Sequence, residues 1–558
     1  MIVKSVEQAL QQALKSLGLE FSEITFEHPG DMVHGDYATN IALVLAKKEG
    51  KNPKELAEQI VDAFVKPDEV ERLEVAGPGF INIFLSRSFF RDSVKKIVAE
   101  GERWGAHDTY KDVHVMVEYT QPNPFKPFHI GHLMSNTIGE SISRLYEFAG
   151  AEVRRANYQG DVGLHVAKAL WGLRKTGGDP SNIDDIARAY VAGNKAYEDE
   201  ETAKKEIVSY NAMVYENAKE IAEEYAVGRR VSLEHFEELY KILGTRFDYY
   251  FFESETTLPG RALVKEGLAT GVFEESEGAV VFKGEPYGLH TRVFLNQQGL
   301  TTYEAKDLGL AQLKAQKWDF DISITTTAVE QQEYFKVIFK ALALLRPELA
   351  PKLRHVSHGM MSLTGEKMSS RKGNVITGES LIQDMLALAK EKVKERNFND
   401  EEKDTIAHAV AVAAIKYSVL KQKAGKNIVF NPEQALSFEG DSGPYLQYAH
   451  TRAISIIEKA KQVGLVASTT LAPQESTELE KLLYRFPDVV LHAVEEYEPH
   501  YITTYLTELA SVWNSWYASE KVIDESSTAP YKLAIVQAFA HTMKNGLYLL
   551  GIQAPERM

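Results

Sequence analysis

The feature that most constrains this chain is a strand-like run that leads through a short loop into a long helix. Residues 113–117 read Val-His-Val-Met-Val, which is typical of a strand buried in a parallel sheet. A proline-rich loop follows, and apolar residues then recur with helical spacing from 129 to about 148, where Gly150 provides a stop. Strand, loop and helix in this order open a Rossmann-like doubly wound unit. We therefore expect an α/β core here.

The rest of the chain predicts different structure on either side of this core. With 558 residues, the chain is long enough for three or four domains. The expected organisation is an α+β domain at 1–108, with helices near 3–17 and 53–65 and a strand at 80–85; an α/β domain at 109–395, with a charged helical insertion at about 170–245 and further strands at 279–282 and 319–324; and an all-helical domain at 396–558.

Composition narrows the class of protein. The chain has no cysteine, which excludes disulfides and thiolate metal sites. Apolar residues make up 44% and charged residues 25%, and no apolar stretch approaches the roughly 20 residues of a membrane helix. We expect a soluble cytoplasmic protein without membrane contact. The net charge of −16 argues against a nucleic-acid binder, although a global charge does not describe local patches.

The first motif with chemical meaning lies where the strand gives way to the helix. Residues 128–132 read Phe-His-Ile-Gly-His. The free N–H groups of a helix N-terminus favour anions, and His129 and His132 can both donate hydrogen bonds to phosphate oxygens there. Gly131 leaves room for a flat base to approach the backbone. The alternatives are two surface histidines or a metal pair, but no further ligands stand at a characteristic spacing, and we predict no structural metal.

The second motif is the cationic stretch 365–374, Gly-Glu-Lys-Met-Ser-Ser-Arg-Lys-Gly-Asn. Its cations, hydroxyls and bracketing glycines suit a loop that binds a polyphosphate, although an exposed basic turn would look the same. The sequence Gly-x-x-x-x-Gly-Lys-Ser/Thr is absent, which excludes a P-loop NTPase.

Together the two motifs resemble the signature pair of class I aminoacyl-tRNA synthetases, and the surrounding residues resemble the arginyl-tRNA synthetase family. The similar stretches span the chain: Pro-Asn-Pro-Phe-Lys-Pro-Phe at 122–128, Asn-Tyr-Gln-Gly-Asp-Val-Gly at 157–163, Gly-Pro-Tyr-Leu-Gln-Tyr at 443–448 and the terminus at 549–558. The resemblance implies a Rossmann-like catalytic domain, an N-terminal tRNA-binding domain and a helical anticodon-binding domain. It also implies ligation of L-arginine to tRNA(Arg) by way of an arginyl-adenylate, with ATP and Mg²⁺, in a monomer that needs tRNA for the activation step.

The resemblance also implies the ATP-binding residues. They are Phe128, His129, Gly131, His132, Lys367, Met368 and Ser369. The sequence departs from the class at Ser370, where a second lysine usually supplies the main transition-state cation. The catalytic set is therefore His129 and His132 with one or more of four cations, and the choice among these stays open: Lys126, Lys367, Arg371 and Lys372.

A substrate guanidinium needs carboxylate and carbonyl-type acceptors, because it offers five donors and no acceptor. The stretch 301–307 reads as a helix start that places Tyr303 and Asp307 on one face. By the resemblance these two residues bind arginine, with Asp307 on the guanidinium. The same resemblance adds Asn123, Glu253 and Gln331.

The residues expected to contact tRNA lie near the two ends of the chain. Tyr445, Tyr448 and Arg452 share a helical face suited to stacking on unpaired bases, although an amphipathic core helix would show the same spacing. The family adds Met558, Phe80 and Asn82. The alternatives are a class I synthetase for another amino acid, a cytidylyltransferase-type enzyme, which would be shorter, and a non-catalytic tRNA-binding paralogue, which would be expected to lack a histidine of the first motif.

Overall fold

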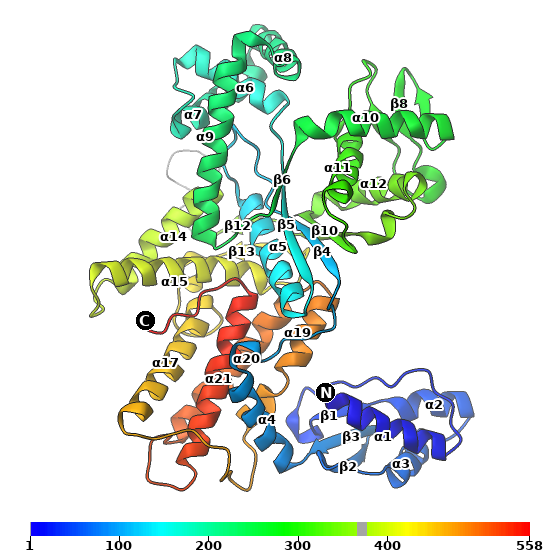
Figure 1. Ribbon diagram of the computed structural model, residues 1–558, viewed down its shortest axis with the longest axis vertical. Helices are drawn as coiled ribbons and strands as arrows, with labels where there is room; N and C mark the ends of the chain where they lie inside the picture. Colours follow the sequence, from blue (N-terminus) through cyan, green and yellow to red (C-terminus); the bar gives the residue numbers. More distant parts are fainter. Residues whose placement is uncertain (1, 365–376) are drawn as a thin grey trace. The chain divides into compact units, whose positions relative to one another are not determined.

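The computed structural model describes residues 2–364 and 377–558 (Figure 1). The chain forms two compact units, and each of them combines separate stretches of sequence. The first contains residues 1–104, 452–486 and 508–543, and the second contains residues 105–451, 487–507 and 544–558. Residues from beyond 396 therefore belong to both units.

The N-terminal part of the first unit packs three helices against an antiparallel sheet of order β1-β3-β2. Val6, Leu10 and Leu14 are fully buried on one face of the first helix, which confirms the amphipathic pattern. Gly79 lies in the turn that joins β2 to β3. The elements are α1 (Ile2–Ser16), β1 (Tyr37–Thr39), α2 (Ile41–Glu49), α3 (Pro53–Ala63), β2 (Val70–Ala76), β3 (Phe80–Leu85) and the following α4 (Arg87–Glu100).

The second unit is built on a parallel sheet of order β11-β10-β4-β5-β6. Val115, Met116 and Val117 are fully buried, as expected for a strand covered on both faces. The strands and the first crossover helix are β4 (His114–Glu118), α5 (Ile130–Phe148), β5 (Glu152–Gln159), β6 (Tyr249–Phe252), β10 (Ile322–Ala328) and β11 (Leu353–His358). Because β5 and β10 both pair with β4, the strand order reverses beside β4, and ligands of such sheets bind at this point.

The predicted helical insertion lies between β5 and β6. Its four helices pack on one another (Figure 1): α6 (Leu164–Thr176), α7 (Ile183–Asp199), α8 (Glu201–Glu216) and α9 (Lys219–Leu243). Ile186 and Ala189 of α7 are buried against α6, while the acidic residues of the first turn stay at the surface. The insertion thus has its own apolar core.

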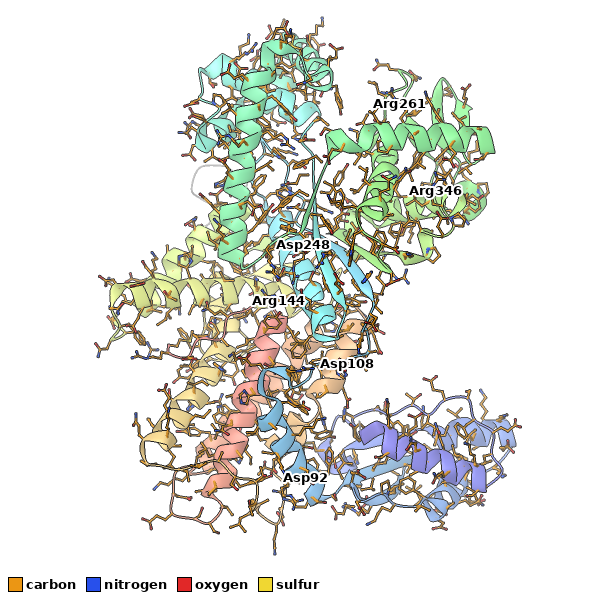
Figure 2. The ribbon with its side chains drawn as sticks, viewed as in Figure 1. Asp92, Asp108, Arg144, Asp248, Arg261 and Arg346 are labelled. Carbon is orange, nitrogen blue, oxygen red and sulfur yellow. The ribbon has the colours of Figure 1, made fainter. Side chains whose placement is uncertain are left out.

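A further group of elements follows β6 and packs into a second core. It consists of α10 (Glu253–Thr270), β7 (Glu274–Ser276), β8 (Ala279–Phe282), β9 (Arg292–Leu295), α11 (Tyr303–Lys317) and α12 (Gln332–Leu345). Arg346, labelled in Figure 2, joins two of these helices through a bidentate ion pair with Glu266. The prediction of β8 is confirmed, but the strand expected at 319–324 begins only at Ile322. The side chain of Asp321 instead accepts a hydrogen bond from the backbone of His114 at 2.9 Å.

The remaining described residues are mainly helical, as predicted. The helices are α14 (Gly378–Val393), α15 (Asp400–Leu420), α16 (Pro432–Ala435), α17 (Gly443–Gln462), α18 (Glu478–Leu483), α19 (Phe486–Glu495), α20 (His500–Ser519) and α21 (Ala529–Leu549). The exception is the short strand β13 (Ile428–Phe430), which pairs in parallel with β12 (Met361–Leu363). Within 2–364 and 377–558, no helix combines the length and apolar character that crossing a membrane requires.

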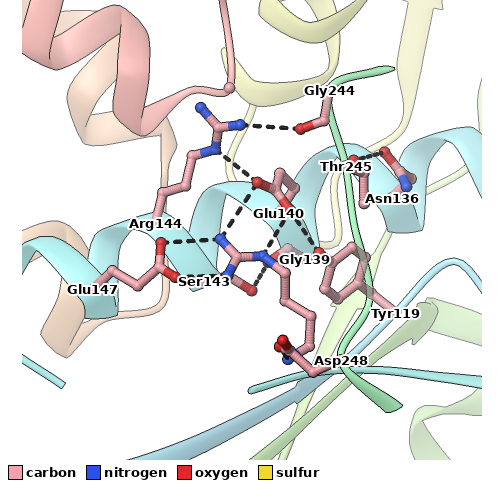
Figure 3. A network of polar contacts seen from close by, with 12 residues as sticks. Tyr119, Asn136, Gly139, Glu140, Ser143, Arg144, Glu147, Gly244, Thr245 and Asp248 are labelled. Carbon is pink, nitrogen blue, oxygen red and sulfur yellow. Dashed lines mark hydrogen bonds and ion pairs between the residues drawn. The ribbon is translucent and has the colours of Figure 1, made fainter. Parts of the chain in front are cut away.

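Buried charges meet on α5 and β5 (Figure 3). Glu140 is 3% exposed, and its two carboxylate oxygens accept hydrogen bonds from the Nε atoms of Arg144 at 2.7 Å and Arg155 at 3.0 Å. The Tyr119 hydroxyl donates to the same carboxylate at 2.6 Å. Arg155 also makes a bidentate pair with Glu147. Burial alone would raise the pKa of Glu140, but the two guanidinium groups hold it below its ordinary value.

The same network joins the ends of two other helices to α5. Arg144, labelled in Figures 2 and 3, donates to the backbone oxygen of Gly244 at the end of α9 and to that of Tyr548 near the end of α21. Asp248, just before β6, accepts a hydrogen bond from the backbone of Arg155 at 2.8 Å. We call this set of residues the Glu140 network; its charges are satisfied within the chain.

Candidate active site

The loop between β4 and α5 is held in an unusual backbone conformation. Thr120, Gln121 and Phe125 all have positive φ, at 77°, 57° and 67°. Residues with side chains rarely adopt such angles, and strain of this kind persists only where the surroundings impose it. Their three backbone N–H groups donate at 3.1 Å each to the side chains of Ser135, Asn157 and Ser232. The loop that precedes the two histidines is therefore fixed by three separate elements.

The two histidines lie at the start of α5 with their rings stacked, 3.4 Å between centroids. His132 is buried, and its Nδ1 accepts the backbone N–H of His129 at 3.2 Å, so the neutral ring carries its proton on Nε2. Burial first, and then the neighbouring charges, lower the pKa of His132, and the pKa of His129 falls to about 4 for the same reasons. Both rings are therefore neutral hydrogen-bond donors at neutral pH.

The other two residues of this motif serve the packing around the rings. A Cβ on Gly131 would lie 3.1 Å from the His129 ring, so glycine permits the stacked arrangement. Phe128 is 1% exposed and belongs to an apolar core, while its backbone oxygen accepts a hydrogen bond from Gly378 at 2.8 Å. The side chain of Phe128 is a core residue in this structure.

A cavity of about 670 Å³ opens beside the strained loop, among β4, β5 and helices α6, α7, α10, α11 and α12. All five residues expected to hold the amino acid line it, and so does Lys126. Its other charged or ring-bearing lining residues are Glu118, Tyr158, His165, Lys168, Tyr190, Arg292, Glu304, Glu330, Tyr334 and Phe335. The resemblance thus selected residues that the fold brings together from distant parts of the sequence. We call this space the reaction cavity.

Asp307 is the most unusual group in its wall. Burial raises the pKa of this carboxyl to about 7, and the charges of Glu118, Glu253 and Glu304 add to the increase, against a hydrogen bond from the Tyr334 hydroxyl. No cation of the described chain pairs with it. Asp307 is half-buried, and a carboxylate without a cation partner in such a place gains from any cation that enters the cavity.

The acidic neighbours of Asp307 are already neutralised. Glu118, at the end of β4, accepts from Lys314 at 2.9 Å, and Glu304 accepts from Arg292 at 3.2 Å. Glu253 pairs with Lys306, which also donates to the Tyr215 hydroxyl at 3.0 Å. Among the acids that line the cavity in the described part of the chain, only Asp307 and the exposed Glu330 lack a cation partner.

The Asn-Tyr-Gln-Gly-Asp stretch at 157–161 explains how Asn123 and Glu253 meet. Asn123 accepts the backbone N–H of Gly160 at 2.9 Å, and a Cβ on Gly160 would lie 2.8 Å from both Asn123 and Glu253. Glycine at this position lets the two side chains keep these places without shifting. Asp161 is buried and accepts the backbone N–H and the hydroxyl of Ser254, both at 2.9 Å, which fixes the start of α10 beside Glu253.

The remaining predicted site residues fall into two groups, those of the cationic stretch and two further residues of the cavity wall. Lys367, Met368, Ser369, Arg371 and Lys372 lie outside the described residues. Tyr303 is 68% exposed at the start of α11, and Gln331 ends a short 3-10 turn (Val329–Gln331) beside the cavity.

The expected tRNA contacts range from exposed to buried. On α17, Tyr445 is half-buried, Tyr448 is 39% exposed, and the Arg452 guanidinium lies 4.3 Å from the Tyr517 ring centroid. Met558 packs against the core formed by α14 and α15. Phe80 is half-buried on β3, and Asn82 is 6% exposed on the same strand.

Sequence reasoning missed the groups that set the charge of the cavity. Glu118, Lys306 and Tyr334 were not selected, although Glu118 ends the first strand of the α/β core and Lys306 precedes Asp307. Ligands of parallel sheets bind at the carboxyl ends of the strands, so the position of Glu118 at the end of a strand could have identified it. Within 2–364 and 377–558, no cluster of three histidine or acidic side chains is arranged to hold a metal ion.

Family models match almost the whole chain. The model described as tRNA synthetases class I (R), catalytic domain, matches residues 93–432. The DALR anticodon binding domain matches residues 446–558, and the arginyl tRNA synthetase N terminal domain matches residues 4–85.

Individual relatives agree with these models. The chain is 32% identical to arginine–tRNA ligase 1 of Bacillus cereus, with 92% of each chain covered, and 31% identical to the arginine–tRNA ligase of Clostridium botulinum, with 99% of each covered. The arginyl-tRNA synthetase structure of Thermus thermophilus matches with a TM-score of 0.82 and 28% identity over 100% of both chains. The cavity whose Asp307 carboxylate has no cation partner among the described residues thus lies in a chain that belongs to the arginyl-tRNA synthetase family, whose function is to charge tRNA with arginine.

Proposed function

We propose that this chain ligates L-arginine to tRNA(Arg) through an arginyl-adenylate, and that it needs bound tRNA for the activation step. The choice of amino acid rests on Asp307, a carboxyl of the reaction cavity that has a raised pKa and no cation partner among the described residues. Arginine offers a planar guanidinium that is always charged, and it thus supplies the cation that this carboxylate lacks. An apolar substrate would leave the carboxylate unpaired.

Other residues of the cavity wall position the rest of the arginine molecule. Glu253, held by Lys306, and Asn123, held by Gly160, are positioned for the amino or carboxylate end of arginine. Tyr303 and Gln331 lie at other points of the cavity wall. Such positioning is the main contribution that the chain makes to the reaction, because a carboxylate and a phosphate need to be aligned more than activated.

In the activation step, a carboxylate oxygen of arginine bonds to the α-phosphorus of ATP. The bond from that phosphorus to the bridging oxygen breaks, and pyrophosphate leaves with the electron pair. His129 and His132 stabilise the charge that develops on the phosphate by donating hydrogen bonds as neutral rings. The terminal ribose hydroxyl of tRNA then attacks the carbonyl carbon of the adenylate and loses its proton. The bond from that carbon to the phosphate oxygen breaks, and AMP leaves with the electron pair.

The identity of the main cation stays a prediction with four candidates. Lys126 lines the reaction cavity, whereas Lys367, Arg371 and Lys372 belong to the stretch outside the described residues. Single substitutions of the four, compared by their effect on kcat at saturating ATP, identify the one that acts in the transition state.

Mg²⁺ is proposed here only as a companion of ATP. Mg²⁺ keeps several water ligands and binds readily to nucleotide phosphates. The described residues contain no ready-made cluster of acidic or histidine ligands. We therefore assign Mg²⁺ no protein ligand.

We also propose the roles of the outer domains from their sequence resemblance. Residues 396–558 read the anticodon with Tyr445, Tyr448, Arg452 and Met558, and residues 1–108 contact tRNA through Phe80 and Asn82. The catalytic domain comprises residues 109–395. A monomeric state and a cytoplasmic location stay predictions.

The test is arginine-dependent exchange of pyrophosphate into ATP, with and without tRNA(Arg), against a panel of other amino acids. We expect exchange with arginine only when tRNA is present. Exchange without tRNA would retain the substrate but remove the tRNA requirement. Exchange with another amino acid, or none with folded protein, would contradict the proposal.

A further inference from the structure

The two lysines that line the reaction cavity make no ion pair with a described residue, and burial lowers the pKa of Lys168 against the more distant charge of Glu198. Lys126 lies in the loop after β4 and Lys168 lies on α6, and both line the cavity. In the described part of the chain, no carboxylate is within ion-pair distance of either ammonium group. The pKa of Lys126 is lowered by burial and then by the charge of Lys168, so the two cations lie close enough to repel each other.

Uncharged groups on one face of α7 hold these lysines. Tyr190, Asn194 and Tyr197 are spaced four and three residues apart, which places them on the same side of the helix. The Nζ of Lys168 donates to Asn194 Oδ1 at 2.8 Å and lies 4.4 Å from the Tyr197 ring centroid. The Nζ of Lys126 lies 5.8 Å from the Tyr190 ring centroid.

The backbone is shaped to bring this face of α7 against Lys168. A Cβ on Gly193 would lie only 2.0 Å from the backbone oxygen of Lys168, so α6 and α7 approach each other too closely for any other residue. Asn194 follows directly in the sequence and reaches the ammonium group of the same lysine. Two consecutive residues of α7 therefore contact Lys168, Gly193 at its backbone and Asn194 at its side chain.

The lysines behind the cavity are held in a different way. Lys306 and Lys314 pair with the carboxylates of Glu253 and Glu118, which cancel their charge. A ring face or an amide oxygen stabilises an ammonium group through partial charges and leaves its full charge available. Two such cations in one wall favour a ligand that brings several negative charges, such as a polyphosphate.

We propose that Lys168 binds a phosphate group of ATP in the reaction cavity, and that Asn194 and Tyr197 are its positioning residues. This inference rests on the proposed function and adds a contact that the sequence motifs do not contain. The contact neutralises part of the charge that pyrophosphate carries as it leaves. It comes from the helical insertion, in a chain whose cationic stretch 365–374 has Ser370 where its class has a second lysine.

The test compares Lys168→Met, Lys168→Arg and Lys168→Gln with the control Lys175→Met in the full-length protein. Lys175 lies on the same helix but pairs at the surface with Glu206. The readouts are the KM for ATP in the exchange reaction and the affinity for pyrophosphate by calorimetry. We expect Lys168→Met and Lys168→Gln to weaken both about tenfold or more, because a charge-assisted hydrogen bond is lost. Lys168→Arg and Lys175→Met should stay close to the parent chain, and Asn194→Ala should show a smaller loss than Lys168→Met.

Unchanged affinity for ATP and pyrophosphate in folded Lys168→Met and Lys168→Gln would overturn the inference. It would also be overturned if only the KM for tRNA rose, because Lys168 would then contact the RNA. The pyrophosphate titration needs no turnover. A parent chain that binds pyrophosphate through Lys168 but shows no arginine-dependent exchange would therefore contradict the proposed function and leave this contact standing.

Discussion

Glu140 and Asp307 are carboxylates of the same α/β unit, but only Glu140 has cation partners within the described part of the chain. Glu140 accepts from two guanidinium groups and a hydroxyl, and its pKa lies below the ordinary value. Asp307 has one hydroxyl donor and no cation, and its pKa is raised to about 7. A charge that is balanced inside the chain contributes to structure. A half-buried carboxylate without a cation partner, such as Asp307, costs stability and is retained where a ligand supplies the partner.

The largest effect is expected in the Glu140 network. Glu140→Gln leaves Arg144 and Arg155 without their shared carboxylate, and breaking a buried pair costs about 3–5 kcal/mol. Denaturant unfolding should show this loss, while the folded enzyme keeps its KM for arginine. Glu147→Gln is the matched control, because Glu147 is more exposed and binds only Arg155. An equal loss in both variants would contradict the central role of Glu140.

The second prediction concerns Asp307 in the reaction cavity, where we expect a loss of activity without a loss of stability. Asp307→Asn keeps the shape of the side chain but cannot balance a guanidinium, so kcat/KM for arginine should fall by about 2–4 kcal/mol in transition-state terms. The free energy of unfolding should stay the same or increase, because an unpaired carboxylate is removed. Unchanged arginine saturation would refute the assignment of Asp307.

The third expectation concerns pH. Arginine binds the ionised form of Asp307, whose pKa is about 7 in the empty cavity, so affinity should rise as pH increases through this value. The KM for arginine should be about tenfold lower at pH 8 than at pH 6. The Asp307→Asn variant provides the control, since its KM should show no such step. A KM that increases with pH would contradict this reading.

The smallest effect is expected at Tyr334, whose hydroxyl holds down the pKa of Asp307. Tyr334→Phe should move the pH step upward and raise the KM for arginine a few-fold at neutral pH, in line with one lost hydrogen bond of roughly 1 kcal/mol. Steady-state kinetics across the pH range measure both changes. A step that stays in place would show that the hydroxyl does not act on Asp307.

Much of the architecture followed from local pattern. The strand–loop–helix unit, the helical insertion and the helical C-terminal part were all predicted, because apolar periodicity and start and stop residues are local properties. The misplacement of β10 by three residues has a non-local cause, since the preceding Asp321 binds the backbone of His114. The motifs also identified the family, because their residues and spacing can be read directly from the sequence. The resemblance then selected five residues of one cavity wall.

The balance of charges was decided by the tertiary structure alone. The resemblance selected Glu253 and Asp307 but not Glu304, and the sequence did not show which of these acids has a cation partner. Only the folded chain shows that Lys306 and Arg292 neutralise the two glutamates and leave Asp307 unpaired. In the same way, only the folded chain shows that Lys168 is held by an amide oxygen of α7 and makes no ion pair with a described residue. The physical reason is that the energy of a charge depends on the dielectric and on partners within a few ångströms, and these partners come from residues far apart in the chain.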